Sequence, residues 1–233
     1  IVGGAATQLN ARDRPQYFRP TTDIDVIFDK YSKESERKKW ARAVAANISW
    51  RGYPAAGSVT NHGAEARFTG ISPDLIVHLD CTSKDYFTRH EKRLAIEFER
   101  ACVEQMGGVK VRYASPQDVI ASKLNRINRV LSYRDTDLTS RQSSFVDAVT
   151  AGSFDDLVLP GFESELQRLL ATRSQNIETL ARVGFNETKR LIAIYKIDKD
   201  IYDIALTVSV SRDHNKSIPK SEFLTHCALL KSA

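Results

Sequence analysis

The clearest strand pattern lies near the start of the chain, at residues 23–28, where apolar and polar positions alternate. Successive side chains of a strand point to opposite faces. Asp23, Asp25 and Ile27 therefore share one face, and three apolar residues share the other. The pattern predicts a strand whose two carboxylates project side by side.

The rest of the first half alternates between short apolar stretches and helical patterns, separated by Gly, Pro and Ser turn signals. After a short strand start at Ile1 and Val2, the apolar stretches predict strands at residues 65–71, 75–81 and 109–113. Apolar residues at helical spacing predict a helix at residues 33–50. Two more helices are predicted, a short one at residues 5–11 and a charged one at residues 86–105.

Helical patterns dominate from Ser115 onwards. Ser115 is a suitable N-cap, Pro116 suits the first helical position, and Asp118 follows three residues after the cap. These features predict a helix over residues 116–131. Further helices are predicted at residues 142–151, 163–180, 186–197, 199–210 and 220–231. The whole pattern predicts an α+β fold, with a mixed β-sheet flanked by helices in residues 1–114 and an all-helical region in residues 115–233.

Composition narrows the class of protein. The chain has 233 residues, of which 42% are hydrophobic and 27% charged, as in ordinary globular proteins. Its apolar runs are shorter than the ~18 residues that span a bilayer, and its start lacks the pattern of a signal peptide. Three widely spaced cysteines favour neither a disulfide framework nor a zinc site. We expect a cytoplasmic protein that does not bind a membrane.

The net charge of +5 is unevenly distributed. Residues 151–233 contain equal numbers of basic and acidic side chains, so the whole excess lies in residues 1–150. Such an excess is compatible with a polyanionic partner, although a modest surplus of this size is also common on solubilising surfaces.

Missing motifs exclude several enzyme classes. The opening Ile-Val-Gly-Gly is also that of activated trypsin-like proteases, but the Gly-Asp-Ser-Gly motif of those enzymes is absent and the second half is helical. The chain also has no G-x-S-x-G, Walker A or G-x-G-x-x-G motif. The motifs therefore exclude the hydrolase, P-loop and Rossmann classes of protein.

The acidic pair on the first predicted strand points to metal chemistry. Alternate strand positions supply two hard oxygen ligands for a divalent cation, although an isolated pair also suits a solvated strand face. Upstream, Gly3 and Gly4 open a predicted helix, whose exposed N–H groups can hold phosphate oxygens. Asp80 ends an apolar strand and is the candidate third carboxylate, with Asp74 in reserve. Alternatively, Asp80 is a turn residue at the end of the strand.

A basic ridge follows one side of the helix predicted at residues 116–131. Lys123, Arg126 and Arg129 recur every three residues, beside an apolar stripe of Ile120, Leu124, Ile127 and Leu131. A lysine there suits a triphosphate, and the two arginines suit an RNA backbone. The alternative is a solvated helix face that binds nothing.

In order along the chain, four segments together resemble the AbiEii/MenT family of nucleotidyltransferase-like toxins, over roughly residues 1–150. These segments are Gly3-Gly4-Ala5, Arg19-x-Thr21-x-Asp23-Ile24-Asp25-Val26, Asp80, and Ala121-Ser122-Lys123-Leu124. The family belongs to the DNA polymerase β-type nucleotidyltransferase superfamily. The resemblance implies a nucleotidyltransferase-type sheet in residues 1–114 and a helical domain in residues 115–233 that contributes Lys123 to the site.

The resemblance also implies roles for single residues. Gly3 and Gly4 would hold the triphosphate of an NTP, Asp23 and Asp25 would bind Mg²⁺, and Lys123 would contact the nucleotide phosphates. Arg19 and Thr21 match the Arg-x-Ser/Thr ahead of the acidic pair. A later Arg-Asp-x-x-Asp element of the family fits Arg134 to Asp137 in part and fits Asp147 better.

Together, these observations predict a Mg²⁺-dependent enzyme with catalytic Asp23, Asp25, Asp80 and Lys123. The resemblance implies a toxin that adds nucleotides to the 3′ end of tRNA, blocks translation and is neutralised by a cognate antitoxin. Two alternatives remain. The same site could transfer a nucleotide to a small molecule or a protein, or the domain could be a non-catalytic nucleotide-binding module.

Overall fold

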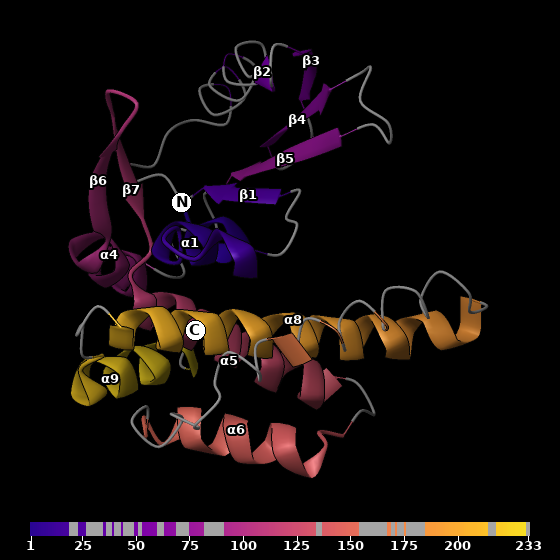
Figure 1. The fold of residues 1–233 in the computed structure, drawn as a ribbon, viewed down its shortest axis with the longest axis vertical. Coiled ribbons are helices and arrows are strands. Elements are labelled where there is room, and N and C mark those ends of the chain that lie inside the picture. Colours follow the sequence, from indigo (N-terminus) through magenta and orange to yellow (C-terminus); the bar gives the residue numbers. More distant parts are fainter. Residues whose placement is uncertain are drawn as a thin grey trace. The chain divides into compact units, whose positions relative to one another are not determined.

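The computed structural model describes residues 1–18, 23–26, 35, 39, 43, 49–50, 53–59, 63–68, 75–81, 91–133, 137–153, 167–168, 171, 175, 185–213 and 218–231. The chain divides into two compact units (Figure 1). The first contains residues 1–6 and 20–114, and the second contains residues 7–19 and 115–233.

The first unit contains a five-stranded sheet in the order β1-β5-β4-β3-β2 (Figure 1). β1 runs parallel to β5, and the other neighbouring strands are antiparallel. The strands are β1 (Asp23–Val26), β2 (Ser49–Trp50), β3 (Tyr53–Val59), β4 (Gly63–Phe68) and β5 (Leu75–Cys81). The prediction at residues 75–81 is confirmed, whereas β3 was not predicted and residues 49–50 form a strand instead of ending a helix.

Helix α4 (Glu91–Arg100) leads into a separate hairpin of β6 (Cys102–Met106) and β7 (Val109–Tyr113). The helix predicted through residue 105 is therefore wrong over β6. Gly107 and Gly108 form the turn with φ angles of 54° and 82°. A two-residue turn with positive φ at both positions matches the twist of paired strands, so this Gly-Gly pair favours a hairpin over a longer helix.

The first two residues connect the hairpin to the sheet within this unit. The Ile1 amine donates to Arg112 O at 2.9 Å, and Ala114 N donates to Ile1 O at 2.9 Å. Val2 N then donates to Asp25 O of β1 at 3.0 Å. Helix α1 (Gly3–Asn10) begins directly after these contacts, two residues earlier than predicted. These hydrogen bonds hold the start of α1 next to β1, the strand that contains Asp23 and Asp25.

The described part of the second unit is helical, which confirms the prediction for the C-terminal region at this level. Its elements are the short helix η1 (Pro15–Tyr17), α5 (Pro116–Tyr133), α6 (Ser140–Thr150), α8 (Phe185–Asp213) and α9 (Lys220–Lys231). Residues 167, 168, 171 and 175, within the helix predicted at 163–180, are also helical. None of the described helices combines the length and apolar character needed to cross a bilayer.

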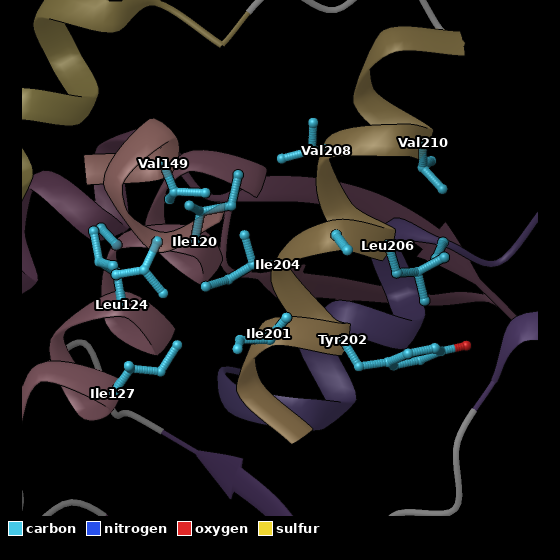
Figure 2. Packing of buried hydrophobic residues seen from close by; sticks show 14 of the residues in the cluster. Ile120, Leu124, Ile127, Val149, Ile201, Tyr202, Ile204, Leu206, Val208 and Val210 are labelled. Carbon is cyan, nitrogen blue, oxygen red and sulfur yellow. The ribbon is translucent and has the colours of Figure 1, made fainter. Parts of the chain in front are cut away.

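Helix α8 is the centre of this unit, and every residue from Ile201 to Val208 is buried. Figure 2 shows Ile201 and Ile204 of α8 facing the apolar stripe of α5, which includes Ile120 and Leu124. A helix that is buried on all sides must satisfy any polar side chain it carries with a partner inside the protein.

The two helices predicted at residues 186–197 and 199–210 are one continuous helix. The polar residue at the predicted break, Asp198, accepts a hydrogen bond from Gln142 Nε2 at 2.8 Å and is 5% exposed. The start of α5 agrees with the prediction, because Ser115 Oγ accepts from Asp118 N at 3.4 Å and donates to its carboxylate at 2.6 Å.

Candidate functional site

The carboxylate of Asp25 lies directly against the first residue of α1. Gly3 has a φ of +67°, and a Cβ atom built on it would lie 2.2 Å from Asp25 Oδ2. Only glycine fits here, because other residues disfavour this backbone region and a methyl group would overlap the carboxylate. Gly4 is buried beside it. Gly3 thus permits the close approach between a helix N-terminus and an acidic side chain.

Asp80 is brought beside this carboxylate by the pairing of two strands. Asp25 and Asp80 are Cα partners in the parallel β1–β5 pair, and Asp23 is the partner of His78. Neighbouring strands lie about 4.8 Å apart, and partner positions share a face of the sheet. Asp23, Asp25 and Asp80 therefore occupy neighbouring positions on one face, although only the side chain of Asp25 is described.

Two positive groups lie near Asp25, the start of α1 and the Ile1 amine. The N–H groups at the start of α1 carry the positive end of the helix dipole, which favours an anion. Burial lowers the pKa of the Ile1 amine below its usual value, and the nearby Asp25 carboxylate opposes this shift.

The three acidic positions suit magnesium by their chemistry. Mg²⁺ prefers hard oxygen ligands such as carboxylates. Like charges at neighbouring positions repel one another, and a divalent cation bound between them would remove that repulsion. Among the side chains that the structure describes, no three of the His, Cys, Asp and Glu type gather around one point. The match between these three acidic positions and Mg²⁺ therefore depends on the carboxylate chemistry and on the strand register.

Replacing Gly3 by alanine is expected to destabilise the first unit. The left-handed backbone costs an alanine about 1–2 kcal/mol, and the overlap with Asp25 adds to it. Gly107→Ala is the matched control, because Gly107 also has a positive φ but nothing lies within 4 Å of its built Cβ. In urea unfolding, Gly3→Ala should lose at least about 1 kcal/mol more than Gly107→Ala. Equal losses of unfolding free energy in the two variants would contradict the close approach of Gly3 to the Asp25 carboxylate.

In the second unit, Lys123 is buried in an ion-pair network with α8. Its Nζ lies 2.6 Å from Asp203 Oδ2 and 3.5 Å from Asp200 Oδ1. Lys123 is 3% exposed, Asp203 0% and Asp200 1%. A solvent-exposed ridge at this position, as the helix pattern predicts, is therefore wrong for Lys123. A lysine this buried requires counter-ions of its own.

The two arginines of the predicted ridge differ. Arg126 forms a bidentate ion pair with the Asp200 carboxylate. Its Nε donates to Oδ2 at 2.6 Å, and its Nη2 donates to Oδ1. Its side chain keeps 43% exposure. Arg129 is exposed. Of the three cations, Arg129 thus best matches the solvent-facing position that RNA binding requires.

The remaining predicted site residues are scattered or not described. Asp147 is exposed on α6. Arg19, Thr21, the reserve acid Asp74 and residues 134–136 lie outside the described residues.

Asp200 and Asp203 are the residues that the sequence analysis missed. They lie within the stretch from Ile197 to Leu206, where acids interrupt apolar residues on all sides of a helix. Such an interruption is a signal for a buried polar contact, since a fully buried aspartate needs a partner. The sequence pattern was divided into two helices at Asp198, so the row of acids within one buried helix was not recognised.

Comparison of the chain with models of protein families, with curated proteins and with solved structures gave no match.

Proposed function

We propose that this protein is a Mg²⁺-dependent nucleotidyltransferase that uses an NTP and releases pyrophosphate. The observation that carries the proposal is the contact of Gly3 with the Asp25 carboxylate, beside the Asp25–Asp80 register pair. It places an anion-favouring helix start against the Asp25 carboxylate, whose strand pairs in register with the position of Asp80. In this reading, the sheet of the first unit is of the nucleotidyltransferase type.

Each group of the site has a distinct part in the proposed reaction. Asp23, Asp25 and Asp80 would hold Mg²⁺, which supplies charge neutralisation for phosphate oxygens and a lower pKa for an attacking hydroxyl. Gly3 and Gly4 would hold the triphosphate through backbone N–H groups of the helix start. By the family resemblance alone, Lys123 would supply a point charge for the phosphates. The residues therefore act by positioning the nucleotide and neutralising its charge.

The acceptor in this proposal is the 3′ hydroxyl of tRNA, whose extension would block translation. Two features support an RNA acceptor, namely the excess of positive charge in residues 1–150 and the exposure of Arg129. The resemblance to the toxin family supports tRNA as the RNA and a cognate antitoxin as a partner.

The direct test is incubation of the protein with labelled NTPs, Mg²⁺ and total tRNA. We expect label at the tRNA 3′ end, and we expect chelation of the metal to abolish it and added Mg²⁺ to restore it. Label on a small molecule or a protein, with none on RNA, would support the other acceptor class. NTP binding without label on any acceptor would support a non-catalytic nucleotide-binding module, and absence of both label and Mg²⁺-dependent NTP binding would contradict the proposal.

A further inference from the structure

The β6–β7 hairpin has no role in the proposed reaction, and its surface is unusual. Two of the four large hydrophobic side chains that the described residues leave exposed belong to it, Val103 at 46% and Val109 at 64%. The strands β6 and β7 form a sheet of their own. A two-stranded hairpin is marginally stable in water unless another element covers it. The hairpin is therefore a candidate for pairing with a further strand.

The backbone of β7 has one edge that β6 does not cover. At the end of this edge, Arg112 O accepts a hydrogen bond from Ile1 N and Ala114 N donates to Ile1 O, both at 2.9 Å. Backbone groups of a strand alternate between its two edges, so those of Lys110 face the same way as those of Arg112. The N–H and C=O of Lys110 and the N–H of Arg112 therefore lie along this edge. No strand of the described residues pairs with these three groups.

The side chains along this edge separate charge from apolar surface. Lys110 and Arg112 share one face of β7, and Val109 and Val111 share the other. Both cations are exposed. Arg112 contacts α4, because its Nη1 donates to Phe98 O at 3.1 Å and its guanidinium lies 5.3 Å from the centre of the Phe98 ring. The ion pairs of the described residues involve neither cation, so both charges are available to a partner.

Two kinds of occupant fit this edge poorly. In a second copy of the chain, antiparallel pairing about Val111 would set Lys110 of one copy opposite Arg112 of the other. Like charges directly opposite destabilise a strand pair, and an edge lysine is a common device against self-pairing. The phosphates of a nucleic acid would meet both cations, but they offer no donor to Lys110 C=O and no apolar contact to Val109.

We propose that this edge of β7 is a docking site for an extended acidic segment of a partner protein. The segment adds a strand beside β7 through the free backbone groups of Lys110 and Arg112. Its alternate residues are Asp or Glu on the face of the two cations and apolar on the face of Val109, because successive side chains point to opposite faces. Docking requires no nucleotide, metal or RNA.

The probe for this site is a capped, fluorescent heptapeptide of alternating valine and glutamate, titrated with the full chain and followed by anisotropy. We expect saturable binding, and about tenfold weaker binding when lysine replaces glutamate in the peptide. Lys110→Glu should raise the Kd of the glutamate peptide about tenfold. Lys196→Glu makes the same charge change at an exposed position of α8 and should leave this Kd within about twofold.

Proline variants test the addition of a strand. Lys110 and Gln105 are partners in the hairpin, and their N–H groups point outward at its two opposite edges. Proline at such a position removes only the outward donor. Lys110→Pro should bind the peptide about threefold more weakly than Lys110→Ala, which loses the charge but keeps the N–H, and Gln105→Pro should stay within about twofold of wild type.

Hydrogen exchange locates the site in the wild-type chain, whether or not the proline variants fold. The glutamate peptide should slow amide exchange within residues 107–114, because Lys110 and Arg112 gain backbone partners there. Unchanged exchange in this segment at saturating peptide overturns the docking site.

Four other results also overturn the proposal. They are no saturable binding up to about 1 mM peptide, equal binding of the lysine peptide, an unchanged Kd in Lys110→Glu, and equal weakening by Lys110→Pro and Gln105→Pro. Self-association in sedimentation equilibrium that Lys110→Pro abolishes would assign the edge to a second copy instead. Binding of tRNA that Lys110→Glu weakens, without peptide binding, would assign it to RNA. A failure of nucleotide transfer to tRNA leaves the docking site standing.

Discussion

Asp25→Asn will lower nucleotide transfer to tRNA at least a hundredfold, which corresponds to about 2.7 kcal/mol of transition-state stabilisation. Asparagine keeps the shape of the side chain and can still accept a hydrogen bond at the start of α1. It removes the negative charge that a magnesium ion needs from a ligand at this position. The loss should therefore appear in transfer and in Mg²⁺-dependent NTP binding, with little change in the fold.

Asp13→Asn is the matched control for this experiment. Asp13 is exposed in the turn after α1, and its replacement removes the same charge from the same chain. Its transfer rate should stay within about twofold of wild type, since surface substitutions seldom have large effects. Retention of more than a tenth of the activity by a folded Asp25→Asn variant would show that Asp25 does not bind the catalytic metal.

Lys123→Met will cause the largest loss of stability, about 3–5 kcal/mol in the free energy of unfolding of the second unit. Methionine nearly matches lysine in length but leaves the fully buried Asp203 without the cation 2.6 Å from it. An uncompensated charge in the interior is far more costly than the loss of one packing contact. Urea unfolding followed by circular dichroism measures the difference.

The double variant Lys123→Met with Asp203→Leu separates charge from packing. It removes both charges of the pair and fills the space with apolar groups, so most of the lost stability should return. A loss of less than about 1 kcal/mol of unfolding free energy in Lys123→Met would contradict a buried Lys123–Asp203 ion pair. A double variant as unstable as Lys123→Met would contradict it too.

Local signals in the sequence predicted several elements well. The Ser115 cap and the following Pro116 mark the start of α5, because capping involves groups only three residues apart. The strand at residues 75–81 was predicted from its apolar pattern in the same way. Such features need no partner from elsewhere in the chain.

The prediction failed where pairing with a neighbouring strand decides the secondary structure. Residues 102–105 include Glu104 and Gln105, which are good helix formers, and the sequence pattern predicts them as the end of a helix. Their pairing with β7 across the Gly107-Gly108 turn makes them a strand instead. Strand preference depends on the neighbouring strand, so it is weakly visible in a local window.

By itself, the sequence determined the alternation that sets Asp23 and Asp25 on one face, the glycines that α1 begins with, and the helical character of the second unit. Only the tertiary structure decided that Asp80 is the register partner of Asp25 and that Lys123 binds Asp203, 80 residues further along the chain. The physical reason is that periodicity tells which face of an element a side chain occupies. Its partner on that face depends on how the chain packs, and packing brings together residues with no spacing in common.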